Sequence, residues 1–233
     1  MPTISLGGQK FSYSIKKKII DSLSLRLKST NSFLVTCPFF VTSSSIDRFI
    51  QNHSSWVIKN SGKLAPPKKL ASLKTVSILG KGYQITIRKT TRDSMVIFEN
   101  EQTIYANSIL LTEAHLRHLF DTKFRPLAQK LIKSELHQLQ FQFGFPFKKI
   151  TVKNQSSLFG SCSSVGNLNF NWQIIFFSPA QFRHILLHEL THLSVKNHSH
   201  LFWQTLSKYD PNWRQNRLWL KKEGSRHFLI SHK

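Results

Sequence analysis

The segment His188-Glu189-Leu190-Thr191-His192 constrains the fold of this chain more than any other stretch of its sequence. The residues in and around it are largely apolar: Ile185, Leu186, Leu187, Leu190 and Leu193. A helix with apolar residues nearly all round lies in the interior of a domain. Buried His and Glu side chains need polar partners, and a shared metal ion satisfies several of them at once. The segment therefore predicts a buried helix that holds a metal site.

The spacing of the two histidines supports this interpretation. Residues four apart lie on one face of a helix, so His188 and His192 can direct imidazole nitrogens at one ion. Glu189 lies beside them and can act on a metal-bound water without occupying a ligand position. The alternative is an ordinary helix whose two histidines are satisfied by hydrogen bonds.

An open zinc site needs a third protein ligand. His198 follows His188 by ten residues. We expect the helix to end at Lys196-Asn197, because Asn tolerates the left-handed conformation, and we expect Ser199 to cap the next helix. Such a turn would bring the His198 imidazole back toward the pair.

Other third ligands remain open at this point. His184, one turn before His188, lies near the same helix face and is the main competitor. His200 is the next candidate, although we expect it to point elsewhere from the start of the following helix. The only carboxylates after the motif are Asp210 and Glu223, and this scarcity argues against a helix-borne glutamate as the third ligand.

Metzincins share the ten-residue step between the first and third histidines, but this chain does not fit their pattern. Those enzymes place a glycine seven residues after the first histidine, where this chain has Val195. They also need a later methionine turn, and the only methionines here are Met1 and Met95. The metzincin interpretation therefore fails.

A different series of motifs, spread over residues 150–222, fits better. In chain order they are Phe159-Gly160-Ser161-Cys162-Ser163, Asn167-Leu168-Asn169-Phe170-Asn171-Trp172, Pro179, His188-Glu189-Leu190-Thr191-His192-Leu193, Asn197-His198-Ser199, Phe202-Trp203, Pro211 and Trp219-Leu220. In this order and spacing the chain resembles the YgjP-like family, a group of predicted zinc metallohydrolases related to the WLM and SprT-type metallopeptidases. The strand-rich first half resembles the N-terminal β-region of that family more weakly.

The resemblance implies one Zn²⁺ per chain, bound by His188, His192 and His198, with Glu189 as the catalytic base. Two positions depart from the usual family pattern. Leu158-Phe159 stands where the family has Arg-Trp, and Arg183-His184 stands where it has Asp-Tyr. We expect these departures to alter substrate contacts or packing near the site, not the zinc chemistry.

The hydrophobic pattern changes near residue 106. Residues 9–106 predict mostly strands, with one helix at Ser45–Lys59. The later pattern predicts a long helix to about Phe143 that could break at Pro126, strands at Lys149–Lys153 and Asn167–Asn171, and helices at Pro179–Val195, Ser199–Lys208 and Asn212–Lys222. The predicted fold is α+β, with an N-terminal β-rich region (1–106) followed by a zincin-like, mainly helical catalytic domain with a small sheet (107–233). No internal repeat is recognised.

Charge is the outlier of the composition. Lys+Arg 33 against Asp+Glu 11 gives a net charge of +22. A positive field over the whole body favours polyanionic partners such as nucleic acid, nucleotides or anionic lipid, and solubility alone is the alternative. Cys37 and Cys162 cannot make a disulfide framework, and neither a signal peptide nor an apolar run of the ~20 residues that span a bilayer is present. We expect a soluble cytoplasmic protein without a membrane span.

Three further features have both a functional and a structural interpretation. Cys162 could be a nucleophile, but we favour a small apolar side chain after a tight turn at Gly160. The strand Asn167–Asn171 could be an edge that pairs with an extended substrate, or an ordinary strand of a sheet. We expect core and lid packing rather than base stacking for three tryptophans: Trp203, Trp213 and Trp219.

Together these features predict a zinc-dependent hydrolase, foremost a metallopeptidase of the His-Glu-x-x-His type in which Glu189 is the general base for a zinc-activated water. One alternative is hydrolysis of a nucleotide phosphoanhydride at the same metal site. The chain lacks a Gly-rich phosphate loop and has few acidic residues for magnesium, which counts against that reaction. The other alternative is a basic nucleic-acid-binding protein whose metal is structural.

Overall fold

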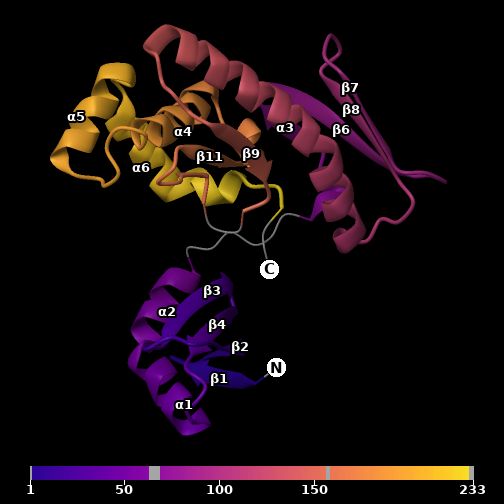
Figure 1. Cartoon of the computed structure of the whole chain (residues 1–233). Coiled ribbons are helices and arrows are strands. Elements are labelled where there is room, and N and C mark those ends of the chain that lie inside the picture. The colour runs from indigo at the N-terminus through magenta and orange to yellow at the C-terminus, as the bar shows by residue number, and fades with distance from the viewer. Residues whose placement is uncertain (1, 63–68, 156–157, 231–233) are drawn as a thin grey trace. The chain divides into compact units, whose positions relative to one another are not determined.

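The computed structural model describes residues 2–62, 69–155 and 158–230, which belong to two compact units, 1–67 and 68–232 (Figure 1). Both units combine strands and helices, so the predicted α+β class is confirmed. Within the described ranges, no helix is at once long enough and apolar enough to cross a membrane.

The first unit is a four-stranded sheet with two helices packed on one face. Its elements are β1 (Thr3–Leu6), β2 (Gln9–Lys17), β3 (Ser24–Ser29), β4 (Ser32–Cys37), α1 (Ser43–Asn52) and α2 (Ser54–Ser61). Alternate residues of the strands point inward, so Phe11 and Phe33 pack with Ile46 and Val57 of the helices in one buried cluster. The single helix predicted at Ser45–Lys59 is wrong in detail, because the chain leaves helical geometry at His53.

The second unit contains the remaining elements. They are η1 (Leu70–Ser72), β5 (Thr75–Ile78), β6 (Lys81–Lys89), β7 (Ser94–Phe98), β8 (Thr103–Ser108), α3 (Glu113–Phe143), β9 (Lys149–Lys153), β10 (Gly160–Cys162), β11 (Asn167–Asn171), η2 (Trp172–Phe176), α4 (Pro179–Thr191), α5 (His200–Tyr209), α6 (Trp213–Glu223) and η3 (Gly224–His227). One large hydrophobic cluster joins the β5–β8 sheet to the helices. The strands predicted at 149–153 and 167–171 are confirmed.

The long helix α3 packs against the β5–β8 sheet, η2 and α4 (Figure 1). It begins at Glu113, where the Thr112 hydroxyl accepts a hydrogen bond from the backbone N–H of His115. It continues through Pro126 without a break and ends at Gly144, which adopts the left-handed conformation (φ 72°) that glycine favours. The predicted helix to Phe143 is therefore confirmed at its C-terminal end.

The change from strands to helix falls where the sequence pattern changes, because β8 ends at Ser108 and α3 begins at Glu113. The division between compact units lies elsewhere, at 67/68. The β5–β8 sheet shares its buried core with α3 and η2, since Ile85 and Ile104 belong to the same cluster as Phe120 and Trp172. The division into domains at residue 106 stays a prediction.

The structure reveals an internal repeat that the sequence pattern had not indicated. The two four-stranded sheets have equivalent strand orders, β1-β2-β4-β3 and β5-β6-β8-β7, and each has one central parallel pair between antiparallel pairs. The first hairpin of each turns through two residues of positive φ, Gly7-Gly8 and Leu79-Gly80. Each sheet is followed by a helix with a threonine cap, Thr42 or Thr112. The number of residues between equivalent positions of the two copies falls from 72 at the first strands (75 − 3) to 70 at the threonine caps (112 − 42). The sequence therefore shows no fixed period.

A three-stranded sheet supports the helix α4. Its order is β10-β11-β9, with β11 antiparallel to β10 and parallel to β9. The strand Asn167–Asn171 is thus the central strand, and the prediction that it could be a sheet edge is wrong. The edge that packs against α4 is β10.

Candidate metal centre

The helix α4 (Pro179–Thr191) is buried on almost every side, as its sequence predicts. Its buried apolar residues are Phe182, Ile185, Leu186, Leu187 and Leu190. Pro179 occupies the first turn, where the missing N–H costs no hydrogen bond. The helix ends at Thr191, with His192 as the C-cap residue, so the predicted extension to Val195 is wrong. Asn197 is not left-handed either, since Leu79 and Gln102 are the described non-glycine residues with positive φ.

Three imidazoles converge where α4 ends. His188, His192 and His198 each offer one ring nitrogen, and these nitrogens all lie within 4.8 Å of one another. Nε2 of His198 lies 2.9 Å from Nε2 of His188. Two nitrogens that bind one zinc in tetrahedral geometry lie about 3.3 Å apart, so the cluster is close to the required spacing.

The local environment leaves these nitrogens available to a cation. Nδ1–H of His192 donates a hydrogen bond to the Val195 carbonyl at 3.0 Å, which directs the Nε2 lone pair away from that bond. Burial, followed by the charges of His192 and His198, lowers the pKa of His188 to about 3. The neutral imidazole is the form that ligates a metal, so the residues present fit a zinc ion.

Two aromatic side chains of α5 (His200–Tyr209) position the histidines. The fully buried Phe202 ring contacts all three imidazoles, with centroid distances of 4.9 Å to His188, 4.5 Å to His192 and 4.8 Å to His198. Trp203 stacks on the His198 ring at 5.5 Å, and its Nε1–H donates to the His198 carbonyl at 3.1 Å. The exposed third histidine is therefore fixed by α5.

A stack of side chains continues from the site to α6 (Trp213–Glu223). Trp203 stacks on Trp213 with a centroid distance of 4.7 Å and an interplanar angle of 17°. The Arg217 guanidinium lies over the Trp203 ring at 4.6 Å. Trp203 and Trp213 therefore support the site by packing, as expected, and Trp219 packs on Phe177 within the core.

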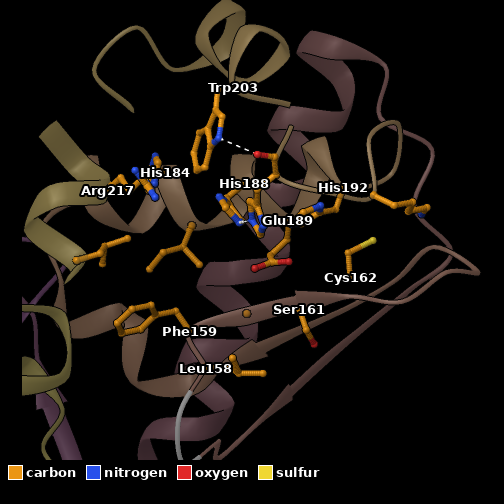
Figure 2. A pocket seen from close by; sticks show the side chains of 15 residues that line it. Leu158, Phe159, Ser161, Cys162, His184, His188, Glu189, His192, Trp203 and Arg217 are labelled. Carbon is orange, nitrogen blue, oxygen red and sulfur yellow. Dashed lines mark hydrogen bonds between the residues drawn. The ribbon is translucent and has the colours of Figure 1, made fainter. Parts of the chain in front are cut away.

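Glu189 lies between the histidine cluster and β10 (Gly160–Cys162), as Figure 2 shows. Its side chain is buried, and burial raises its pKa to about 8. Gly160 packs directly against it: a Cβ added to Gly160 would lie 2.7 Å from Glu189 Cγ and 2.9 Å from Oε1. A carboxylate with a raised pKa is suited to exchanging protons near neutral pH.

An open pocket of about 700 Å³ gives access to these groups. Its lining comes from β10 and the two residues before it, from α4 and the segment after it, and from α5 and α6: Leu158, Phe159, Gly160, Ser161, Cys162, His184, Ile185, His188, Glu189, His192, Lys196, His198, Trp203, Arg217 and Leu220. The pocket combines apolar walls with a few converging polar groups, as ligand sites do.

His184, the main competitor for third ligand, is held away from the cluster. Its Nδ1 lies 2.5 Å from Oδ2 of Asp210, and both side chains are buried. Nδ2 of Asn216 also donates to both carboxylate oxygens at 3.3 Å. Burial alone would raise the pKa of Asp210, but the hydrogen bonds from His184 and Asn216 bring it below the ordinary value. This network joins α4 to the α5–α6 turn.

The remaining sequence candidates also have clear positions. His200 is exposed at the start of α5 and is not part of the cluster. Cys162 lines the pocket, and burial raises the pKa of its thiol, which disfavours the reactive thiolate. Sequence reasoning missed the contact of Gly160 with Glu189 and the support from Phe202. No local pattern marks those contacts, although both residues lie within the motifs of the family.

The two departures from the family pattern have different consequences. Arg183 forms an ion pair with Glu135 and a hydrogen bond with Gln142, which join α4 to α3. Leu158 and Phe159 both line the pocket. The departure at Arg183 therefore concerns packing, and the departure at Leu158-Phe159 concerns the surface that a substrate would meet.

Comparisons with known proteins place the chain in a family. No curated protein matches it. Among solved structures, it is similar to the crystal structure of the metallopeptidase zymogen of Methanocaldococcus jannaschii jannalysin, with 22% sequence identity and a TM-score of 0.36 over 40% of this chain and 95% of that one. The model of the YgjP-like metallopeptidase domain matches residues 21–223. Because this match covers most of the sequence, the chain belongs to the YgjP-like family of metallopeptidases.

Proposed function

We propose that this protein is a zinc-dependent peptidase that holds one Zn²⁺ with His188, His192 and His198 and uses Glu189 as its general base. One observation carries the proposal. Three imidazole nitrogens within 4.8 Å of one another lie beside a buried carboxylate in an open pocket. Three nitrogen ligands leave a fourth coordination position accessible, which is the arrangement of catalytic zinc sites.

When bound, zinc lowers the pKa of a coordinated water and polarises the carbonyl under attack. Glu189 accepts the proton of the attacking water and can return it to the departing amine. Its buried position beside Gly160 keeps the carboxylate oriented. Phe202 and Trp203 hold the imidazoles, so the site needs little rearrangement during the reaction.

The edge strand β10 supports an extended peptide as the substrate. It forms one end of the sheet order β10-β11-β9, and its residues 160–162 line the pocket. The second edge of such a strand offers backbone N–H and C=O groups that can pair with an extended chain. A peptide paired there would run past Glu189 and the three histidines.

A specific observation also favours a second candidate, the nucleotide phosphoanhydride. Lys196 and Arg217 add two fixed positive charges to the pocket lining, where Glu189 is the acidic group among the described residues. Such charges can hold phosphate groups as well as peptide carboxylates. Incubation with nucleoside triphosphates, with released phosphate and pyrophosphate measured, separates this reaction from peptide hydrolysis.

Metal content tests the site first. Plasma mass spectrometry on protein purified without an affinity tag or added metal should find about one zinc per chain. His188→Ala should abolish zinc binding and His198→Ala should weaken it, while the exposed His200→Ala, as a matched control, should retain zinc. A parent that stays metal-free after incubation with zinc would contradict the proposal.

Activity tests the mechanism second. Zinc-loaded parent should hydrolyse an unstructured peptide library, with cleavage sites read by mass spectrometry. Glu189→Gln should retain zinc and lose activity by a factor of about 10² or more, because the proton acceptor is gone. Equal rates for parent and Glu189→Gln on the same peptide would exclude Glu189 as the base.

A further inference from the structure

The ends of β2 (Gln9–Lys17) and β4 (Ser32–Cys37) form a surface that the proposed reaction does not use. The two strands are parallel neighbours in the centre of the sheet, with Lys17 opposite Cys37, so their C-terminal ends lie side by side. Beyond them, the backbone N–H of Lys18 donates to the Cys37 carbonyl at 2.9 Å, and Nζ of Lys17 donates to the Phe39 carbonyl at 3.0 Å. We call the surface at these strand ends the β2–β4 tip. It consists of Lys16, Lys17, Lys18, Ile19, Phe39 and Phe40.

The β2–β4 tip exposes large apolar side chains. Ile19 is 96% exposed, Phe40 is 83% exposed and Phe39 is 61% exposed. Single exposed apolar residues are ordinary, but three bulky ones that follow two neighbouring strand ends mark an interaction site. The hydrogen bonds from Lys17 and Lys18 hold side by side the two segments that lead into these residues.

The same tip carries a dense positive charge. Lys16, Lys17 and Lys18 are consecutive and exposed, and none of them forms an ion pair with a carboxylate among the described residues. The first unit as a whole contains nine Lys and Arg residues through residue 67, against the two acidic residues Asp21 and Asp47. A partner of this tip must therefore accept both cations and protruding apolar groups.

The second copy of the repeat shows that this combination is specific to the first. There, the N–H of Thr90 donates to the Ser108 carbonyl at 2.9 Å, in the same way as Lys18 to Cys37, and Ile109, Leu110 and Leu111 follow the strand. These three residues are only 42–49% exposed. A carboxylate also lies at these strand ends of the second copy, because Asp93 accepts a hydrogen bond from the Ile109 N–H.

We propose that the β2–β4 tip binds the surface of an anionic membrane. Lysines near a negatively charged leaflet and apolar side chains that enter the headgroup boundary reinforce each other, and stable attachment takes both signals. A nucleic acid would neutralise the lysines, but it would leave the aliphatic Ile19 in water. The proposal is independent of the proposed peptidase chemistry, because no residue of the tip lines the pocket.

Co-sedimentation of the full chain with vesicles tests the proposal. The parent should bind phosphatidylcholine vesicles that contain phosphatidylserine, and should not bind phosphatidylcholine alone. The triple variant Lys16→Gln/Lys17→Gln/Lys18→Gln should bind on the order of 100-fold more weakly, since each lysine near such a surface contributes about a five-fold factor. Ile19→Ser/Phe40→Ser should also weaken binding, while the matched pair Ile109→Ser/Leu110→Ser in the second copy should not.

A direct reading of insertion completes the test. Because the chain has five native tryptophans, the emission of the parent is subtracted. The difference spectrum of Phe40→Trp should shift to the blue with vesicles and should be quenched by brominated lipid, whereas that of Leu110→Trp should show neither change. Circular dichroism checks that each variant is folded. Failure of the parent to bind anionic vesicles would overturn the proposal, as would undiminished binding of Ile19→Ser/Phe40→Ser. Retention of an oligonucleotide by a parent that ignores vesicles, with retention lost in the triple lysine variant, would assign the tip to nucleic acid instead.

Discussion

Gly160 of β10 and Glu189 of α4 are in such close contact that a side chain at position 160 would meet the Glu189 side chain where it now lies. A Cβ there would lie 2.7 Å from Glu189 Cγ, 2.9 Å from Oε1 and 3.1 Å from Cδ. Real Cβ atoms essentially never approach other heavy atoms this closely, so Glu189 would have to move. The missing side chain of one residue thus sets the position of the carboxylate that we propose as the base.

Gly160→Ala should lower peptidase activity by about 10²-fold with zinc content unchanged, because a catalytic group displaced by about 1 Å loses that much rate. Steady-state kinetics and metal analysis on the same sample check this. Gly82→Ala is the matched control, since a Cβ on Gly82 of β6 meets nothing within 4 Å. Full activity of Gly160→Ala would show that Glu189 has room to adjust.

Metal-free protein should lose stability as pH rises from about 6.5 to 8. Burial raises the folded-state pKa of Glu189 from 4.5 to about 8, so its stabilising contribution is complete below pH 4.5 and is lost as pH rises through 8. His188 acts in the opposite direction, because its lowered pKa of about 3 removes stability as pH falls from 6.5 to 3. Above pH 6.5 only the Glu189 effect remains.

Urea unfolding of the chelator-treated parent at several pH values measures this loss, whose upper limit between pH 6.5 and 8 is about 2 kcal/mol, at about 1.4 kcal/mol per pH unit. Glu189→Gln removes the titrating group and should give a flat profile over the same interval. A parent profile as flat as that of Glu189→Gln would contradict the raised pKa.

Trp203→Phe should weaken zinc binding by about 10–100-fold. The substitution keeps an aromatic ring against His198 but removes the Nε1–H that donates to the His198 carbonyl. Partners that orient a metal ligand typically contribute this much to metal affinity. Competition with a zinc-binding dye measures the affinity. Trp219 packs on Phe177 and His227, so the control variant Trp219→Phe should bind zinc like the parent.

His184→Leu should destabilise the protein by about 3–5 kcal/mol and leave one zinc bound per chain. It removes the partner of the buried Asp210 carboxylate, and an uncompensated buried charge is expensive. The double variant His184→Leu/Asp210→Leu should recover part of the loss. Arg183→Leu, which breaks a half-exposed pair with Glu135, should cost less than about 1 kcal/mol. Loss of zinc in folded His184→Leu would return His184 to the set of ligands.

Cys162→Ala should retain most of the activity. Burial raises the pKa of the Cys162 thiol, so little thiolate exists at neutral pH, and a nucleophilic role is disfavoured. Alkylation of the native protein by iodoacetamide should be slow for the same reason. Abolished activity in a folded, zinc-loaded Cys162→Ala would make the thiol part of the chemistry.

Several elements could be predicted from the sequence because they depend on local spacing. The α3 stop at Phe143 follows from Gly144, and strand β9 coincides with its predicted bounds at 149–153. The end of α4 could not be predicted in this way. Apolar residues continue past Thr191, but there the chain follows the contacts of His192 with Val195 and Phe202, not its own helical preference.

The spacing along the chain is enough to predict that His188 and His192 share one helix face with Glu189 beside them, because residues within one helical turn have fixed mutual positions whatever the rest of the chain does. Which further histidine lies beside that pair depends on how the helices pack. His198 and His184 are both plausible third ligands by spacing. Asp210, 26 residues after His184, binds the His184 ring, whereas Phe202 and Trp203 pack against the His198 ring. Those contacts depend on how α4, α5 and α6 pack, and packing of separate elements is not encoded in the period of any one of them.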